Sequence, residues 1–167
     1  MDYSEIQFFS VRRFKGAFFI DAPEMMTLFW SKHVESAAWF CPDKECVVSI
    51  VLDTLFQVKA FHLVAIGSVK EVLFEPREIL RPAVALSGAN IVVLHNHPSG
   101  DPSPSNDDVL TTWRLIRAGQ ILGIPIVDHV IIGENCHYSF RENQPELFGS
   151  AGQQDACSEE QHCLLGA

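Results

Sequence analysis

The chain has 167 residues, of which 47% are hydrophobic, and this suits one compact domain with its own core. Twelve basic against 21 acidic residues give a formal net charge of −9, and an acidic surface repels phosphate backbones. The apolar runs are far shorter than the ~20 residues of a membrane span, and the N-terminal residues lack the basic region of a secretion signal. We therefore expect a cytoplasmic protein that contacts neither a membrane nor nucleic acid.

The N-terminal part of the chain is expected to contain an arm and one helix. Residues 1–21 are rich in apolar side chains but are interrupted by basic ones, and we assign this arm no function. Residues 21–24 have the composition of a helix start, so residues 25–40 are predicted to be helical. Trp30 and Trp39 are the expected core anchors of this helix.

Two strands and a second helix are predicted next. Residues 45–53 and 57–67 are rich in Val, Ile and Leu and lie close together in the sequence, so we expect two paired strands. Residues 75–89 favour a helix with a break at Pro82 and an end at Gly88.

The third predicted strand, 90–94, is apolar on both faces, which indicates a central place in a sheet. The following helix begins at Ser105, because Ser105 and Asp108 have the spacing of a capping box. It continues to Gly119 or Gly123.

Two more strands, 124–133 and 136–142, complete the domain, and residues 149–167 have the aperiodic composition of a flexible tail. The order of elements predicts an α/β fold, with a single mixed β-sheet flanked by helices over residues 22–148.

The loop after the central strand, HNHPSGDPSPSNDD, contains a candidate metal site. Side chains alternate along an extended chain, so His95 and His97 point to one side and Asn96 to the other. The prolines turn the chain back, and Asp108 lies in the first turn of a helix, where the helix dipole favours its charge. Two imidazoles and one carboxylate fill three of the four coordination positions of a tetrahedral zinc ion. An open fourth position, which a water molecule can occupy, is typical of catalytic zinc sites.

These residues resemble the JAMM metallopeptidase signature of the JAB/MPN superfamily. The matching positions are His95, His97 and Pro98, then, after six residues, Ser105 and Asp108. More narrowly, HNHPSG, the segment PREILRPA, and VDHVIIG followed by YSF resemble the RadC branch.

The resemblance implies a zinc-dependent peptidase or isopeptidase. His95, His97 and Asp108 would bind zinc, Glu45 would be the general base, and Ser105 would stabilise the tetrahedral intermediate. The implied partner is a protein or peptide substrate, with ubiquitin-like proteins among the candidates.

Two departures from the wider class matter. Many JAMM members carry Ser or Thr between the two histidines, whereas this chain has Asn96, which fits the RadC branch and weakens any transfer of deubiquitinase preference. RadC proteins also often carry a helix-hairpin-helix region, and too few residues precede Glu45 for us to expect one here.

Glu45 has a simpler interpretation as a solvated acid at the end of a strand. In that case the general base must be another glutamate, and the candidates are Glu71, Glu75 and Glu78. Asp128 and His129 could orient a zinc ligand, but a histidine in a buried strand is more often satisfied by the backbone.

Competing functions belong to other classes. An HNH nuclease spreads its residues over a larger unit, and a zinc deaminase needs H-x-E and P-C-x-x-C, which are absent here. The alternatives that stay open are a RadC-like accessory protein of DNA repair or recombination, and a non-catalytic MPN binding scaffold.

Overall fold

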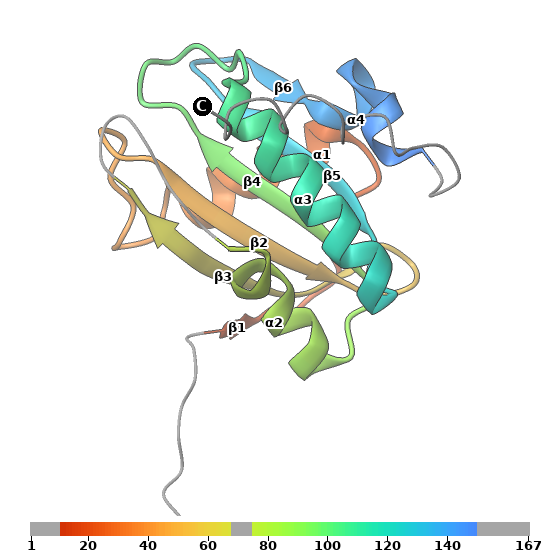
Figure 1. Ribbon diagram of the computed structural model, residues 1–167. Coiled ribbons are helices and arrows are strands. Elements are labelled where there is room, and N and C mark those ends of the chain that lie inside the picture. Colours follow the sequence, from red (N-terminus) through yellow and green to blue (C-terminus); the bar gives the residue numbers. More distant parts are fainter. Residues whose placement is uncertain (1–10, 68–74, 150–167) are drawn as a thin grey trace, which may run out of the picture.

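The computed structural model describes residues 11–67 and 75–149, which form a six-stranded sheet (Figure 1). The strand order is β1-β3-β2-β4-β5-β6. The strands are β1 (Val11–Arg13), β2 (Cys46–Leu52), β3 (Val58–Ile66), β4 (Asn90–Asn96), β5 (Ile126–Ile132) and β6 (His137–Ser139). Strands β4 and β5 are parallel, whereas the other neighbours are antiparallel, so the predicted mixed sheet is confirmed.

Helices cover both faces of this sheet. They are α1 (Pro23–Phe29) with the π-helical turn η1 (Trp30–Val34), α2 (Pro76–Leu86), α3 (Asn106–Leu122), α4 (Phe140–Asn143) and the 3-10 turn η2 (Pro145–Phe148). Helices α2 and α3 lie on one face and α1 on the other (Figure 1). Among the described residues, no helix has the length and apolar character needed to cross a membrane.

The two faces of β2 and β4 supply two layers of the core. Val48 and Leu94 pack toward α1 and Trp30, whereas Val47 and Val93 pack toward α2 and α3. Both strands are buried on both faces, because each lies between two other strands and two layers of helix. The predicted central place of the strand that leads to the histidines is therefore confirmed.

The first helix is shorter than predicted. It passes into the π-helical turn and ends at Val34, where the Glu35 N–H bonds to the carbonyl of Trp30, instead of continuing to Phe40. Trp30 is the expected core anchor, at 1% exposure. Trp39 is only half-buried and packs against the edge of the same layer.

The predicted break at Pro82 is wrong, because α2 continues through this residue to Leu86. Pro82 removes one helical hydrogen bond. The helix is nevertheless held by burial of Ile79 against the sheet, and the Ser49 hydroxyl of β2 donates to the Ile79 carbonyl over 2.9 Å. The left-handed residue that ends the helix is Ser87, and the Gly88 N–H then closes the cap on the Ala83 carbonyl.

The ends of the domain also differ in detail from expectation. Part of the predicted arm belongs to the sheet, since β1 pairs with β3 and Ile20 is fully buried. Helix α3 ends at Gly123, not at Gly119, which lies buried inside it. The last predicted strand stops at Ser139, whose hydroxyl caps α4. Most of the predicted tail, residues 150–167, lies outside the described residues.

Gly88 offers a test of this packing. A Cβ at this position would lie 2.3 Å from Val51 Cγ1, so Gly88→Ala must displace β2 or α2. We expect a loss of about 1–3 kcal/mol in the free energy of unfolding, measured by urea denaturation. The control Gly149→Ala, whose Cβ would approach no atom closer than 3.4 Å, should leave that free energy nearly unchanged. Equal effects of the two changes would contradict the packing described.

Candidate metal centre

The pairing of β2 with β4 brings the first acid to the histidines. Val47 lies opposite His95 in this antiparallel register. Glu45 lies just before β2 and His97 just after β4, so the same register directs both toward one end of the sheet, and Glu45 Oε1 lies 3.8 Å from His97 Nε2. The strand pairing therefore brings close together residues about fifty positions apart in the sequence.

The start of α3 supplies the second acid. The predicted capping box is present: the Ser105 hydroxyl accepts from the Asp108 N–H, and the Asp108 carboxylate accepts from the Ser105 N–H over 2.8 Å. This local motif fixes the carboxylate at the positive end of the helix.

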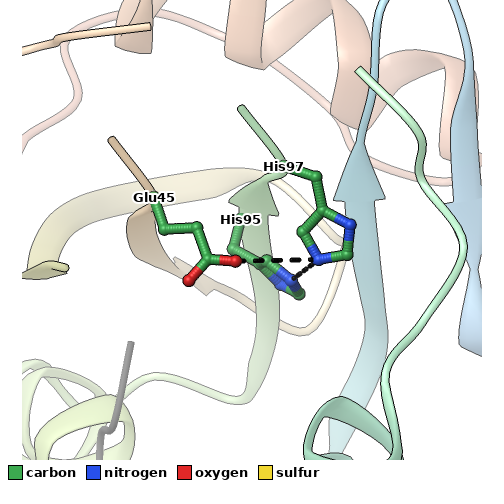
Figure 2. A group of neighbouring side chains, drawn as sticks. All are labelled: Glu45, His95 and His97. Carbon is green, nitrogen blue, oxygen red and sulfur yellow. Dashed lines mark hydrogen bonds and ion pairs between the residues drawn. The ribbon is translucent and has the colours of Figure 1, made fainter. Parts of the chain in front are cut away.

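The four side chains converge on one small volume (Figure 2 shows three of them). The two Nε2 atoms of His95 and His97 are 3.1 Å apart. Asp108 lies 3.3 Å from the first and 3.5 Å from the second. Glu45 Oε1 is 3.8 Å from His97 Nε2, and the ligand atoms of Glu45, His95 and His97 all lie within 4.8 Å of one another. These residues could hold a metal ion.

A chain of hydrogen bonds determines which nitrogen of His95 carries its proton. The Thr112 hydroxyl donates to the Asp108 carbonyl over 2.6 Å, so it accepts from His129 Nδ1, also at 2.6 Å. Burial lowers the pKa of His129 well below its ordinary value, so its ring is neutral and Nε2 is an acceptor. His95 Nδ1 must therefore donate to His129 Nε2 over 2.8 Å. With Nδ1 engaged in this way, the other ring nitrogen of His95, Nε2, faces the centre.

His97 is oriented in the same way by the loop that follows it. Its Nδ1 lies 2.8 Å from the Asp101 carbonyl, which can only accept, so the proton is on Nδ1. The hydrogen bond with Asp108 raises the pKa of His97 and outweighs the opposing effect of burial. Burial raises the pKa of Asp108, but hydrogen bonds from His95 and His97 outweigh it and hold that pKa far below its usual range.

Ser105 is engaged within the centre itself. Its hydroxyl donates to Asp108 Oδ2 over 2.6 Å while it accepts from the Asp108 N–H. Donation to a reaction intermediate therefore requires the hydroxyl hydrogen to rotate away from this carboxylate.

Asp128 and His129, which the sequence left undecided, have different surroundings. His129 is fully buried and contacts His95 directly. The Asp128 carboxylate instead accepts from the Ser139 hydroxyl and from the Arg141 N–H, at the junction of β6 and α4. Burial raises the pKa of Asp128. It also accepts from the backbone N–H of His129 over 2.7 Å, so its contacts tie the strands and the helix together and hold no histidine ring.

Thr112 belongs to the site although no motif in the sequence marks it. Its spacing was the available signal, because Thr112 follows Asp108 by four residues and so lies on the same face of α3. Of the alternative glutamates, Glu78 pairs with Arg81 over 2.9 Å on α2, Glu75 is the exposed residue before that helix, and Glu71 lies outside the described residues.

The fold and these side chains define an α/β domain with a centre that could hold a metal, and sequence comparison assigns its family. The chain belongs to the RadC-like JAB domain family, whose model matches residues 20–145. This confirms the family inferred from the histidine loop.

The chain is similar to curated proteins named UPF0758 protein. The chain is 40% identical over 99 residues to that of Methanosarcina barkeri, 43% over 100 residues to that of Thermotoga maritima, and 36% over 121 residues to that of Methanococcoides burtonii. The aligned parts are 59%, 60% and 72% of this chain and 43%, 45% and 50% of those proteins. The chain thus matches half or less of the length of each relative.

Thr112→Val tests the hydrogen-bond chain, because it removes the hydroxyl at nearly constant volume and leaves His129 Nδ1 without its acceptor. We expect metal affinity, measured with zinc against a competing chelator, to fall by about 10–100-fold. Thr111→Val, one residue away, is the matched control and should retain the parent affinity. A Thr112→Val variant with unchanged affinity would contradict the proposed orientation of His95.

The raised pKa of His97 predicts a pH dependence. A metal needs the deprotonated ring, so protons compete with it from a pH above the ordinary value of 6.5. Zinc affinity should be constant at alkaline pH and then fall about tenfold per unit as the pH drops through the pKa of His97. Chelator competition between about pH 8.5 and about pH 5.5 measures this, and a flat profile would exclude histidine ligands.

Proposed function

We propose that this domain is a zinc-dependent metallopeptidase or isopeptidase of the JAMM type, with a protein or peptide substrate. The observation that carries the proposal is the convergence of Glu45, His95, His97 and Asp108 on one volume. His95, His97 and Asp108 would hold the metal. Glu45, whose Oε1 lies 3.8 Å from His97 Nε2, would act as general base, the role that the resemblance to JAMM metallopeptidases implies.

The chemistry of the donors fits a divalent ion. Both histidines use Nδ1 as a hydrogen-bond donor, so the Nε2 atoms of the two rings face inward, 3.1 Å apart. When both rings are deprotonated, two nitrogen lone pairs and two carboxylates face one another, and they repel unless protons or a cation lie between them. Two nitrogens with carboxylate oxygens are a set that zinc prefers.

The proposed reaction divides the work among the residues. A bound zinc ion supplies a Lewis acid for the substrate carbonyl and lowers the pKa of a water molecule. Glu45 removes a proton from the attacking water and delivers it to the leaving amine. Ser105, after rotation of its hydroxyl, donates to the oxyanion that develops on the carbonyl oxygen.

The non-enzymatic alternatives make different demands on these residues. A binding scaffold has no chemical use for a carboxylate beside a metal site, and a DNA-repair accessory protein would bind nucleic acid against a net charge of −9. DNA affinity measured at physiological salt, beside cleavage assays on ubiquitin-like fusions and unstructured peptides, separates these functions.

A pair of variants separates metal binding from proton transfer. His97→Ala removes a ligand, so zinc content, about one equivalent per chain in the parent by elemental analysis, should fall together with hydrolysis. Glu45→Gln keeps size and hydrogen-bonding reach but removes the base. Zinc should remain while turnover falls by about 10²–10⁴-fold.

His137→Ala and Glu78→Gln are the matched controls, because both side chains lie outside the centre, and both variants should behave as the parent. Zinc far below one equivalent in the parent would overturn the mechanism. If Glu45→Gln cleaves as fast as the parent, Glu45 is not the base.

A further inference from the structure

The residue between the two histidines, Asn96, is only 6% exposed, and the alternation of side chains along a strand turns it away from the side of His95 and His97. Its side chain reaches across to β2. Oδ1 accepts from the Cys46 N–H over 2.9 Å, and Nδ2 donates to the Lys44 carbonyl over 3.0 Å. Asn96 thus binds the backbone on both sides of Glu45, and the two partners leave one possible orientation of the amide.

The amide replaces backbone pairing that ends here. The β2–β4 ladder stops at Val47 and His95, and the His97 N–H donates to the Ile132 carbonyl of β5 instead. Cys46 is fully buried, so its N–H needs a partner from the protein. Asn96 provides that partner beyond the end of the ladder.

Glu45 is held from the opposite side as well. The Gly67 N–H, just after β3, donates to the Glu45 carbonyl over 2.8 Å. The peptide that carries the carboxylate is therefore fixed between β3 and the Asn96 side chain, and Figure 2 shows the carboxylate directed at His97. A serine or threonine hydroxyl has a single oxygen and a shorter reach, so it could not satisfy both Lys44 and Cys46 as the amide does.

We infer that Asn96 is a positioning residue: it fixes the Glu45 backbone so that the Glu45 carboxylate stays beside His97. The catalytic consequence of this inference rests on the proposed function, because Glu45 is the general base only if the domain is a peptidase. Its structural consequence, the location of the Glu45 carboxylate, is independent of any activity. Displacing a reacting group by about 1 Å costs about 10²-fold in rate.

The test compares Asn96→Ala and Asn96→Ser with Asn90→Ala. Asn90 lies on the same strand, and its Nδ2 donates to the Asp53 carbonyl over 3.1 Å at the far end from the centre. All three changes remove side-chain to backbone bonds from β4, but only the first two remove the bonds to Lys44 and Cys46 on either side of Glu45. Thermal midpoints and zinc affinities of the three variants show whether a change in kcat comes from a general loss of stability or from a loss of metal.

We expect the Asn96 variants to retain zinc affinity within about threefold while kcat falls about 10²-fold and KM changes little. In a Glu45→Gln background, Asn96→Ala should cost no further turnover, because both changes disable the same group. Asn90→Ala should retain the parent kcat. Additive losses in the double variant, or a loss of kcat that follows the loss of zinc, would overturn the positioning role.

Crystal structures of the parent and of Asn96→Ser separate this inference from the proposed function. If the parent cleaves no substrate, the peptidase proposal fails, yet the Glu45 carboxylate should still move away from His97 in the variant. An unmoved carboxylate would overturn the inference whatever the activity.

Discussion

The register between β2 and β4 is the constraint on which the whole centre depends. It sets Val47 opposite His95, so Glu45, just before β2, lies near His97, just after β4. A slip of one residue would turn every side chain of one strand to the other face, exchange the two core layers and remove the acid from the histidines. Burial of both strands on both faces makes such a slip costly, so the hydrophobic core specifies the geometry of the polar site.

The parallel pairing of β4 with β5 explains where the centre lies. The chain leaves β4 at its carboxyl end, turns through the proline-rich loop and enters α3, which packs back over the sheet. The amino end of α3 therefore returns to the strand end that carries His95 and His97. There the helix dipole and the capping box hold the Asp108 carboxylate beside the two rings.

Hydrogen-bonding groups around the centre fix the positions of its ionisable side chains. Thr112 and His129 orient His95, the Asp101 carbonyl orients His97, and the Asn96 amide holds the strand end before β2. Hydrogen bonds in a low-dielectric interior are strong and directional, so this outer layer leaves the inner side chains few alternative positions. Such rigidity is what a metal site with a nearby base requires.

The sequence by itself determined what local rules control. The apolar strands follow from composition, and the capping box of Ser105 and Asp108 and the two histidines on one side of the loop follow from spacing. The histidine loop, with the segments PREILRPA, VDHVIIG and YSF, carried the family resemblance. The first helix, predicted to reach residue 40, ends at Val34. The break expected at Pro82 is absent, because contacts with the sheet override the local preference.

Only the tertiary structure decided how distant segments meet. Glu45, the segment from His95 to Asp108, and His129 lie on separate elements, and no spacing rule connects them. The pairing of β2, β4 and β5, and the packing of α3 across them, bring these residues together. The bonds of Asn96 to β2 and of Thr112 to His129 exist only in that arrangement, because they join groups whose proximity is produced by burial of the core rather than by the local chain.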